Sequence, residues 1–138
     1  MNPQTAALVR NSWAEIVPMR KQVCTDFYRR LFERHPDLRP LFKGNIERQT
    51  SLFVTMLNTV VSSLENRDPV LPLIKIVGAR HADYGVEGDD YNKFAEVLLD
   101  SFALALGARF TPEVRAAWAA VYQELADTMR QGAEEARH

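Results

Sequence analysis

The chain has 138 residues, the size of one domain, and its 17 Lys and Arg against 18 Asp and Glu leave a formal net charge of −1. This balance argues against a general nucleic-acid binder, and a hydrophobic fraction of 46% argues against a disordered chain. The single cysteine, Cys24, cannot form an internal disulfide or a multi-cysteine metal site. Without a signal-peptide pattern or an apolar run long enough to cross a membrane, we expect one soluble, cytoplasmic domain over residues 1–138.

Apolar residues recur with helical spacing through the first half of the chain, and proline marks the boundaries. Asn2-Pro3 has the pattern of a helix cap followed by proline in the first turn. His35-Pro36 ends another helix, because a residue before proline disfavours helical backbone. The predicted helices run from Pro3 to Pro18, from about Val23 to His35, briefly over Pro36–Pro40, and, after a loop at Lys43–Asn45, from about Ile46 to Asn66.

The second half of the chain continues the same helical pattern. No segment alternates with period two for long enough to predict a strand, so the fold class is all-α, with about six substantial helices and one or two short ones. The last residues, 132–138, are expected to be frayed. The predicted helices are a short one from Leu71 through His81 that Gly85 ends, one from Gly88 to Gly107, and one that begins at Thr111-Pro112 and is lined as far as Met129.

Few residues in the sequence can carry chemistry. Zinc-protease, phosphate-loop and nucleophile-elbow motifs are absent, and the adjacent acidic pairs are read as caps or surface groups. Of the three histidines, His138 is terminal and His35 is expected to cap a helix end or be solvated. His81 shares an apolar helix face with Val77 and Ile74, which suits either a core residue or a ligand. A cofactor with its own reactivity would explain so sparse an inventory.

Three further polar side chains lie on apolar helix faces: Tyr28, Gln49 and Tyr91. A buried tyrosine hydroxyl or glutamine amide needs a hydrogen-bond partner. Two alternatives remain open from spacing alone. The side chains satisfy one another or a backbone carbonyl, or they face a bound ligand.

Three stretches of the chain resemble one family. DFYRRLFERHPDLRPLF (26–42) is similar to the segment of globins from the second helix to the corner phenylalanine. GARHADYGVEGDDYNKF (78–94) is similar to the haem-ligand helix of bacterial globins, and AWAAVYQELADTM (117–129) to their last helix. The chain as a whole resembles single-domain bacterial haemoglobins and the globin domain of flavohaemoglobins. The resemblance implies a globin fold around a haem b (iron-protoporphyrin IX) pocket.

The resemblance also implies roles on the ligand-binding side of the haem. Tyr28 and Gln49 would be the polar pair that faces the ligand, and Phe53 would be an apolar wall where the family usually has a smaller aliphatic residue. Phe42 would pack on the porphyrin. Arg80 would either pair with a haem propionate or be a solvated surface residue.

On the opposite side, the resemblance implies that His81 ligates the iron. Its second ring nitrogen needs an acceptor, and the Val77 carbonyl, one turn back, is the nearest local candidate. In the family a tyrosine and a glutamate support the ligand histidine, and Tyr91 falls at the place of the tyrosine. The glutamate does not align, because Ala133 occupies its place and Glu134 the next one.

The resemblance implies reversible binding of dioxygen and of other diatomic ligands such as NO and CO. The alternative is a nitric oxide dioxygenase, which would depend on a separate flavin/NAD(P)H reductase because this chain ends before the flavin- and NAD-binding domains of flavohaemoglobins. A third interpretation is a haem-free helical interaction module. The sequence leaves monomer and homodimer open and predicts neither nucleic-acid nor membrane partners.

Overall fold

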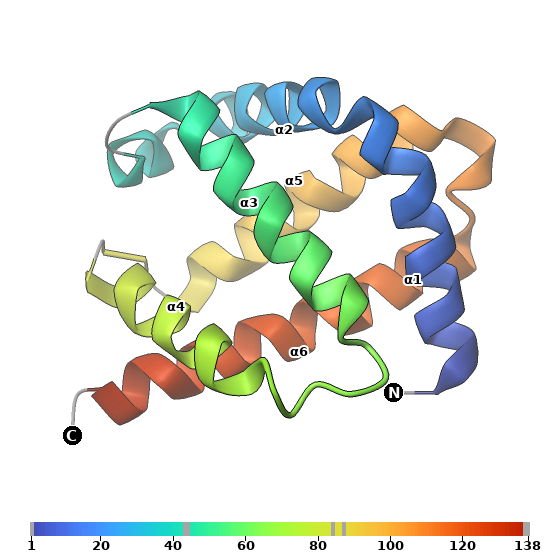
Figure 1. Ribbon diagram of the computed structural model, residues 1–138. Helices are drawn as coiled ribbons and strands as arrows, with labels where there is room; N and C mark the ends of the chain where they lie inside the picture. Colours follow the sequence, from blue (N-terminus) through green and yellow to red (C-terminus); the bar gives the residue numbers. More distant parts are fainter. Residues whose placement is uncertain (1, 43–44, 84, 87, 137–138) are drawn as a thin grey trace.

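The all-α prediction is confirmed. The computed structural model describes residues 2–42, 45–83, 85–86 and 88–136, and within these ranges it consists of helices and their connections, without a strand (Figure 1). The elements are α1 (Pro3–Ile16), the 3-10 turn η1 (Val17–Met19), α2 (Arg20–Arg34), η2 (Pro36–Leu41), α3 (Ile46–Ser62), α4 (Leu71–Asp83), α5 (Gly88–Leu106), η3 (Gly107–Arg109) and α6 (Pro112–Ala136).

Side-chain caps set the beginning of two helices, at Asn2, where a cap was predicted, and at Asn45, where only a loop was predicted. The Asn2 side-chain oxygen accepts a hydrogen bond from the Thr5 N–H at 2.7 Å, and Asn45 accepts one from the Glu47 N–H at 2.7 Å. Each cap satisfies an N–H group that the first helical turn leaves unpaired. The other two residues of the predicted loop before α3, Lys43 and Gly44, lie outside the described residues.

Two predicted helix ends are wrong. α3 ends at Ser62 instead of near Asn66, and the Ser63 N–H bonds the Val60 carbonyl at 3.1 Å, which tightens the last turn. Leu64, buried at 4% exposure, had extended the apolar pattern although it lies in the turn after the helix. α6 continues to Ala136, where frayed residues were expected, because Gly132 is buried against α4.

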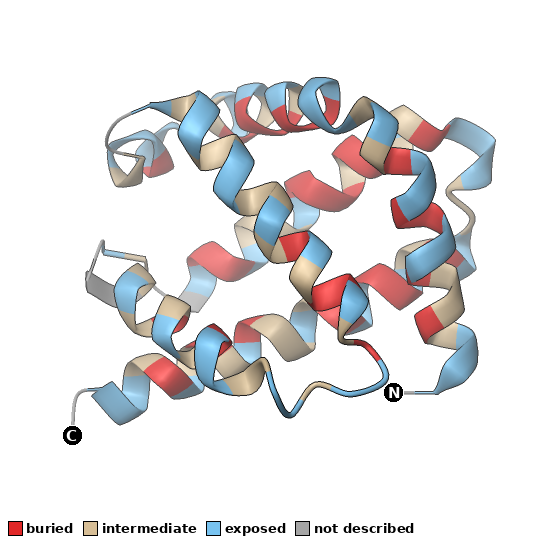
Figure 2. Cartoon of the chain, viewed as in Figure 1, coloured by how far each residue is buried: buried red, intermediate tan, exposed pale blue. Residues whose placement is uncertain are grey.

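The main core lies where α1, α5 and α6 meet. The rings of Trp13, Phe102 and Trp118 form a triangle with centroid separations of 6.5, 6.1 and 4.8 Å. The Trp118 indole N–H donates to the Ser12 hydroxyl at 2.8 Å, and the Trp13 indole N–H donates to the Asn58 side-chain oxygen at 2.6 Å. Figure 2 shows buried residues on the inward sides of α1, α2, α5 and α6, whereas the outer side of α3 is largely exposed.

A second, smaller core joins α4 to α6. It contains Ile74, Tyr91, Ala126 and Met129, with Val77 packed against it. α4 lies beside α6 in Figure 1 and packs chiefly against that one helix, whereas α6 also packs against α1 and α5. The position of α4, and of every residue on it, therefore depends on its contact with α6.

Candidate functional site

His81 is held in a defined orientation near the end of α4. Its Nδ1 lies 2.7 Å from the Val77 carbonyl oxygen, which is the contact the sequence predicts. Because a carbonyl oxygen can only accept, Nδ1 must carry the proton. In the neutral imidazole the lone pair is then on Nε2, and no described residue hydrogen-bonds to that nitrogen.

The end of α4 is fixed immediately after His81. The Val86 N–H donates to the His81 carbonyl at 3.0 Å, across the turn that contains Gly85. Gly85 has φ of +94°, a left-handed conformation that glycine adopts without steric cost. The prediction that Gly85 ends this helix is confirmed, and the turn limits movement of the half-buried His81.

Tyr28 lies in an aromatic cluster on the inner side of α2. It is 5% exposed, and the rings of Phe27, Phe42 and Phe32 lie at centroid distances of 5.1, 5.5 and 6.1 Å. Burial raises the pKa of the Tyr28 hydroxyl, so the group remains a proton donor. Among the described residues it has no hydrogen-bond partner, neither Gln49 nor a backbone carbonyl.

Gln49 and Phe53 share a face of α3, one helical turn apart. Both are half-buried, and the Phe53 ring packs edge-on against Phe27 at a centroid distance of 5.4 Å. The Gln49 side chain makes no hydrogen bond to a described residue. Phe27 thus connects Phe53 of α3 to Tyr28 of α2, and Gln49 lies one turn from this contact.

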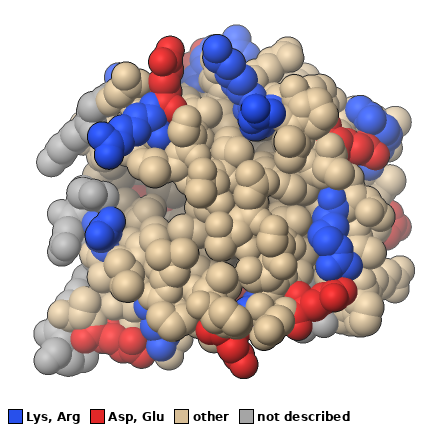
Figure 3. Space-filling view, viewed as in Figure 1, with Lys and Arg blue, Asp and Glu red and all other residues tan. Residues whose placement is uncertain are grey.

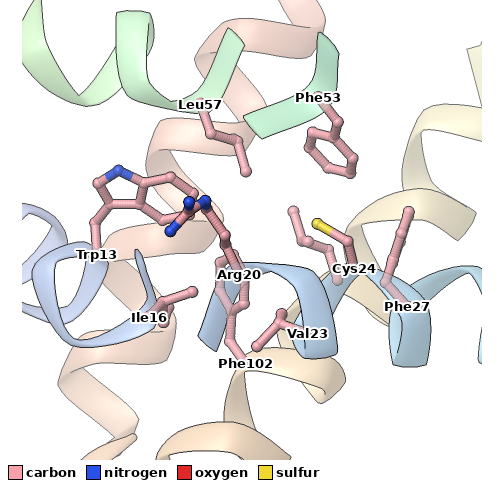
Figure 4. Close-up of a pocket in the computed structure, with 10 residues that line it drawn as sticks. Trp13, Ile16, Arg20, Val23, Cys24, Phe27, Phe53, Leu57 and Phe102 are labelled. Atoms are coloured by element: carbon pink, nitrogen blue, oxygen red, sulfur yellow. The ribbon is translucent and has the colours of Figure 1, made fainter. Parts of the chain in front are cut away.

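A small apolar cavity adjoins the same cluster. Phe27 and Phe53 line one end of it, and Cys24, Val23 and Leu57 continue the wall toward Trp13 (Figure 4). Cys24 is a core residue, as predicted, and burial raises the pKa of its thiol to about 11. A thiol with this pKa stays protonated at neutral pH and is unreactive.

Phe42 connects the cluster to α5. Its ring lies at 6.0 Å and 90° from the ring of Phe94, in addition to its contact with Tyr28. The structure therefore brings Tyr28, Phe42 and Phe53 together, with Gln49 at the edge of the group. His81 lies on α4, outside this aromatic cluster.

Tyr91 is buried next to α6, in the smaller core that contains α4. The Arg130 guanidinium lies 5.1 Å from its ring centroid, and the Tyr122 hydroxyl donates to its backbone carbonyl at 2.8 Å. Arg80 is exposed and forms no ion pair with a described residue, while Glu134 is exposed on α6. Figure 3 shows charged side chains around the edge of the viewed face and an uncharged middle over α3.

The other two histidines do not contribute to this arrangement. The His35 N–H bonds the Leu31 carbonyl at 2.8 Å and ends α2, as expected. Its side chain, for which capping or solvation was expected, is half-buried, and its Nε2 is buried without a hydrogen-bond partner among the described residues. η2, which begins at Pro36, covers this end of the helix. His138 lies outside the described residues.

Sequence reasoning missed two glycines of structural importance, Gly78 in α4 and Gly132 in α6. Both are buried, and a Cβ atom on either would overlap the backbone of the other helix. A glycine inside a helix costs about 1 kcal/mol relative to alanine, which is the signal that could have indicated a close approach.

Comparison with known proteins identifies the family. The family model for globins matches residues 25–129, so the chain belongs to the globin family. Flavohemoproteins from Bacillus subtilis, Rhizobium meliloti and Chromobacterium violaceum are 23%, 32% and 28% identical over 92%, 75% and 94% of this chain. The matched segment makes up 33%, 26% and 33% of these relatives, so the chain spans about a third of their length or less.

Two solved structures share the fold over nearly the whole chain. An engineered carbene transferase, described as a candidate nitric oxide dioxygenase from Rhodothermus marinus, superposes with a TM-score of 0.89 at 28% identity, covering 99% of this chain and 96% of its own. A hexacoordinated haem protein from an anhydrobiotic tardigrade gives a TM-score of 0.85 at 18% identity, covering 97% and 96%. The predicted globin fold is confirmed. Among the described residues, none of the helices is both long and apolar enough to cross a membrane.

Proposed function

We propose that this globin binds haem b through Nε2 of His81 and reversibly binds dioxygen, and other diatomic ligands such as NO and CO, on the side lined by Tyr28, Gln49 and Phe53. Phe42 packs on the porphyrin in this proposal. Val77 and Tyr91 support the histidine side, and Arg80 is available at the surface to pair with a propionate.

The observation that carries the proposal is the orientation of His81. The bond from Nδ1 to the Val77 carbonyl leaves the lone pair on Nε2 and fixes the orientation of the ring, as is usual for histidines that ligate a metal. Among the described residues, no group of three or more His, Cys, Asp and Glu side chains is placed to hold a metal ion. A haem porphyrin would supply four further ligands to an iron that His81 ligates.

The unpaired hydroxyl of Tyr28 supports the ligand-binding role. When bound, haem supplies a ferrous iron that takes a diatomic ligand. Tyr28 is a protonated donor that lacks a partner in the described structure, so its O–H is free to hydrogen-bond a ligand of partial negative charge. Gln49, on the adjacent helix face, can donate to the same ligand or orient Tyr28. Phe53 limits the space beside them.

Haemin titration of the purified protein and of His81→Ala tests the proposal. We expect the wild-type protein to take up one haemin per chain, with an intense absorption band near roughly 400 nm. His81→Ala should lose this spectrum, and added imidazole should restore it by replacing the missing ligand. His138→Ala, which removes the terminal histidine, is the matched control and should leave the spectrum unchanged. An unaltered spectrum in His81→Ala would overturn the proposal.

The comparisons favour one second candidate function, nitric oxide dioxygenase activity. Three relatives are named flavohemoproteins, and a structure 28% identical to this chain is described as a candidate nitric oxide dioxygenase. The reaction joins NO and O2 to nitrate with the uptake of one electron. A separate flavin/NAD(P)H reductase would supply that electron to this chain. Tyr28 and Gln49 would serve both functions.

A further inference from the structure

α4 and α6 approach each other closely enough for their backbones to touch. A Cβ atom built on Gly78 would lie 2.5 Å from the Met129 Cα, and one built on Gly132 would lie 2.5 Å from the Lys75 Cα. Gly78 follows Lys75 by three residues, and Gly132 follows Met129 by three residues. The contact is therefore reciprocal, because each helix presents a glycine to the backbone of the other. Neither helix can yield by rotating a side chain, since the obstructing atoms belong to the main chain.

This contact determines where α4 lies. α6 is held on other sides by α1 and α5, through buried residues such as Trp118. α4 packs chiefly against α6 and has no comparable second support among the described residues. An added methyl group at either glycine would therefore displace α4 rather than α6.

His81 lies three residues after Gly78, on the next turn of the same helix. Val77, whose carbonyl accepts the Nδ1 hydrogen bond, is the residue immediately before Gly78. Because helical hydrogen bonds hold residues 75–81 together, a displacement at Gly78 moves the Val77 carbonyl and the imidazole as one unit. The position of Nε2 relative to α6 then follows from the distance between the two helix axes.

We infer that Gly78 and Gly132 are positioning residues for His81: their close contact sets the distance and tilt at which the imidazole meets the iron. This inference rests on the proposed function. It adds Gly78 and Gly132 to the residues that act on His81. Gly132 lies on another helix, 51 positions away in sequence, so the histidine and its neighbours in the chain do not indicate it.

Gly78→Ala, Gly132→Ala and the double variant test the inference in the haem-loaded protein. The readouts are the iron–histidine stretching frequency of the ferrous form, measured by resonance Raman spectroscopy, and the rate of haemin release. We expect each single variant to shift the frequency and to release haemin about tenfold faster, as for changes in the outer shell of a metal site. The double variant should change less than the two single effects combined, because once the helices have separated for one methyl group the second fits at little extra cost.

Two controls separate positioning from general loss of stability. Gln131→Ala changes the exposed neighbour of Gly132 and should leave both readouts unchanged. Val9→Ala removes volume from a fully buried site in α1 and should lower the melting temperature without shifting the iron–histidine frequency. Glycine variants that behave like either control would overturn the inference.

The outcomes also separate this inference from the proposed function. If the wild-type protein takes up no haemin, the proposed function fails and this inference fails with it. If the wild-type protein binds haemin through His81 and the glycine variants keep its frequency and release rate, only this inference fails. If neither glycine variant folds, hydrogen exchange of the haem-loaded wild-type protein provides the test. We expect the backbone amides of α4 to be as protected as those of residues 129–132. Fast exchange confined to α4 would contradict the inference.

Discussion

One hydrogen bond determines what His81 can do. The bond is local, from a side chain to the carbonyl four residues earlier in the same helix, and it selects the tautomer with a lone pair on Nε2. The environment of Tyr28, in contrast, is set by packing and not by a local hydrogen bond. Phe27 and Phe32 of its own helix and Phe42, which follows η2, surround its ring, and its hydroxyl has no partner among the described residues. In the proposed function, His81 would ligate the iron and Tyr28 would donate a hydrogen bond to the bound ligand.

Replacing Tyr28 with phenylalanine should accelerate oxygen release from the ferrous protein. A hydrogen bond from the phenol to a ligand of partial negative charge is worth about 1.5–3 kcal/mol, and its loss corresponds to a rise of roughly tenfold to a hundredfold in the dissociation rate. Stopped-flow measurement of oxygen dissociation gives the rate directly. Tyr122→Phe is the matched control, since that hydroxyl donates to the Tyr91 carbonyl in the other core. An unchanged rate in Tyr28→Phe would remove this residue from the ligand-binding side.

At the scale of the helices, buried polar contacts connect elements that are distant in sequence. The Ser12 hydroxyl of α1 accepts the Trp118 indole N–H of α6, and it donates to the carbonyl of Leu8 at 2.7 Å. Ser12 is 6% exposed and Trp118 is 2% exposed, so water cannot replace the serine. These residues fix how α1 and α6 pack, and α6 in turn carries α4.

Ser12→Ala should therefore destabilise the protein although alanine is the better helix former. The variant leaves the buried Trp118 N–H without an acceptor, at a cost of about 1–3 kcal/mol, whereas the gain in helix propensity is about 0.5 kcal/mol. Urea unfolding followed by circular dichroism measures the difference. Ser62→Ala, an exposed serine at the end of α3, provides the reference and should stay within about 0.5 kcal/mol of the wild type. Equal stability of the two variants would show that the indole finds another partner.

At the scale of the whole molecule, the two candidate site regions lie in different cores. Tyr28 belongs to the main core, and the surroundings of α4 form the smaller one. The helical framework sets the separation between the two regions. The two proposed functions, reversible oxygen binding and nitric oxide oxidation, would both use this arrangement, and repeated nitric oxide oxidation would in addition require a supply of electrons.

Nitric oxide consumption with and without a reductase distinguishes these functions. With ferrous, oxygen-loaded protein alone, we expect one NO consumed per haem, because no electron remains for a second cycle. With a flavin/NAD(P)H reductase added, the dioxygenase function predicts many turnovers with nitrate as the product, followed with an NO electrode and nitrate analysis. Reductase together with His81→Ala is the control. Consumption that stops after one equivalent in the complete mixture would leave reversible binding as the function.

The features that the sequence alone determined depend on residues within about one helical turn of each other. Asn2 and Gly85 act within one turn of their own position, and they were correctly predicted to begin and to end a helix. The bond from His81 to Val77 was predictable for the same reason, since residues four apart share a helix face. The globin fold could be expected because its apolar spacing and motifs extend along nearly the whole chain.

Only the tertiary structure decided features that depend on a second element. The burial of the His35 Nε2 atom and of the Tyr28 side chain results from the segments packed around them. Gly78 and Gly132 stand out in sequence only as glycines inside helices, and the contact between them appears only when α4 crosses α6. The same crossing keeps α6 helical to Ala136, where local pattern predicted fraying. Local patterns specify hydrogen bonds within a turn, whereas contacts between helices depend on how whole surfaces fit together.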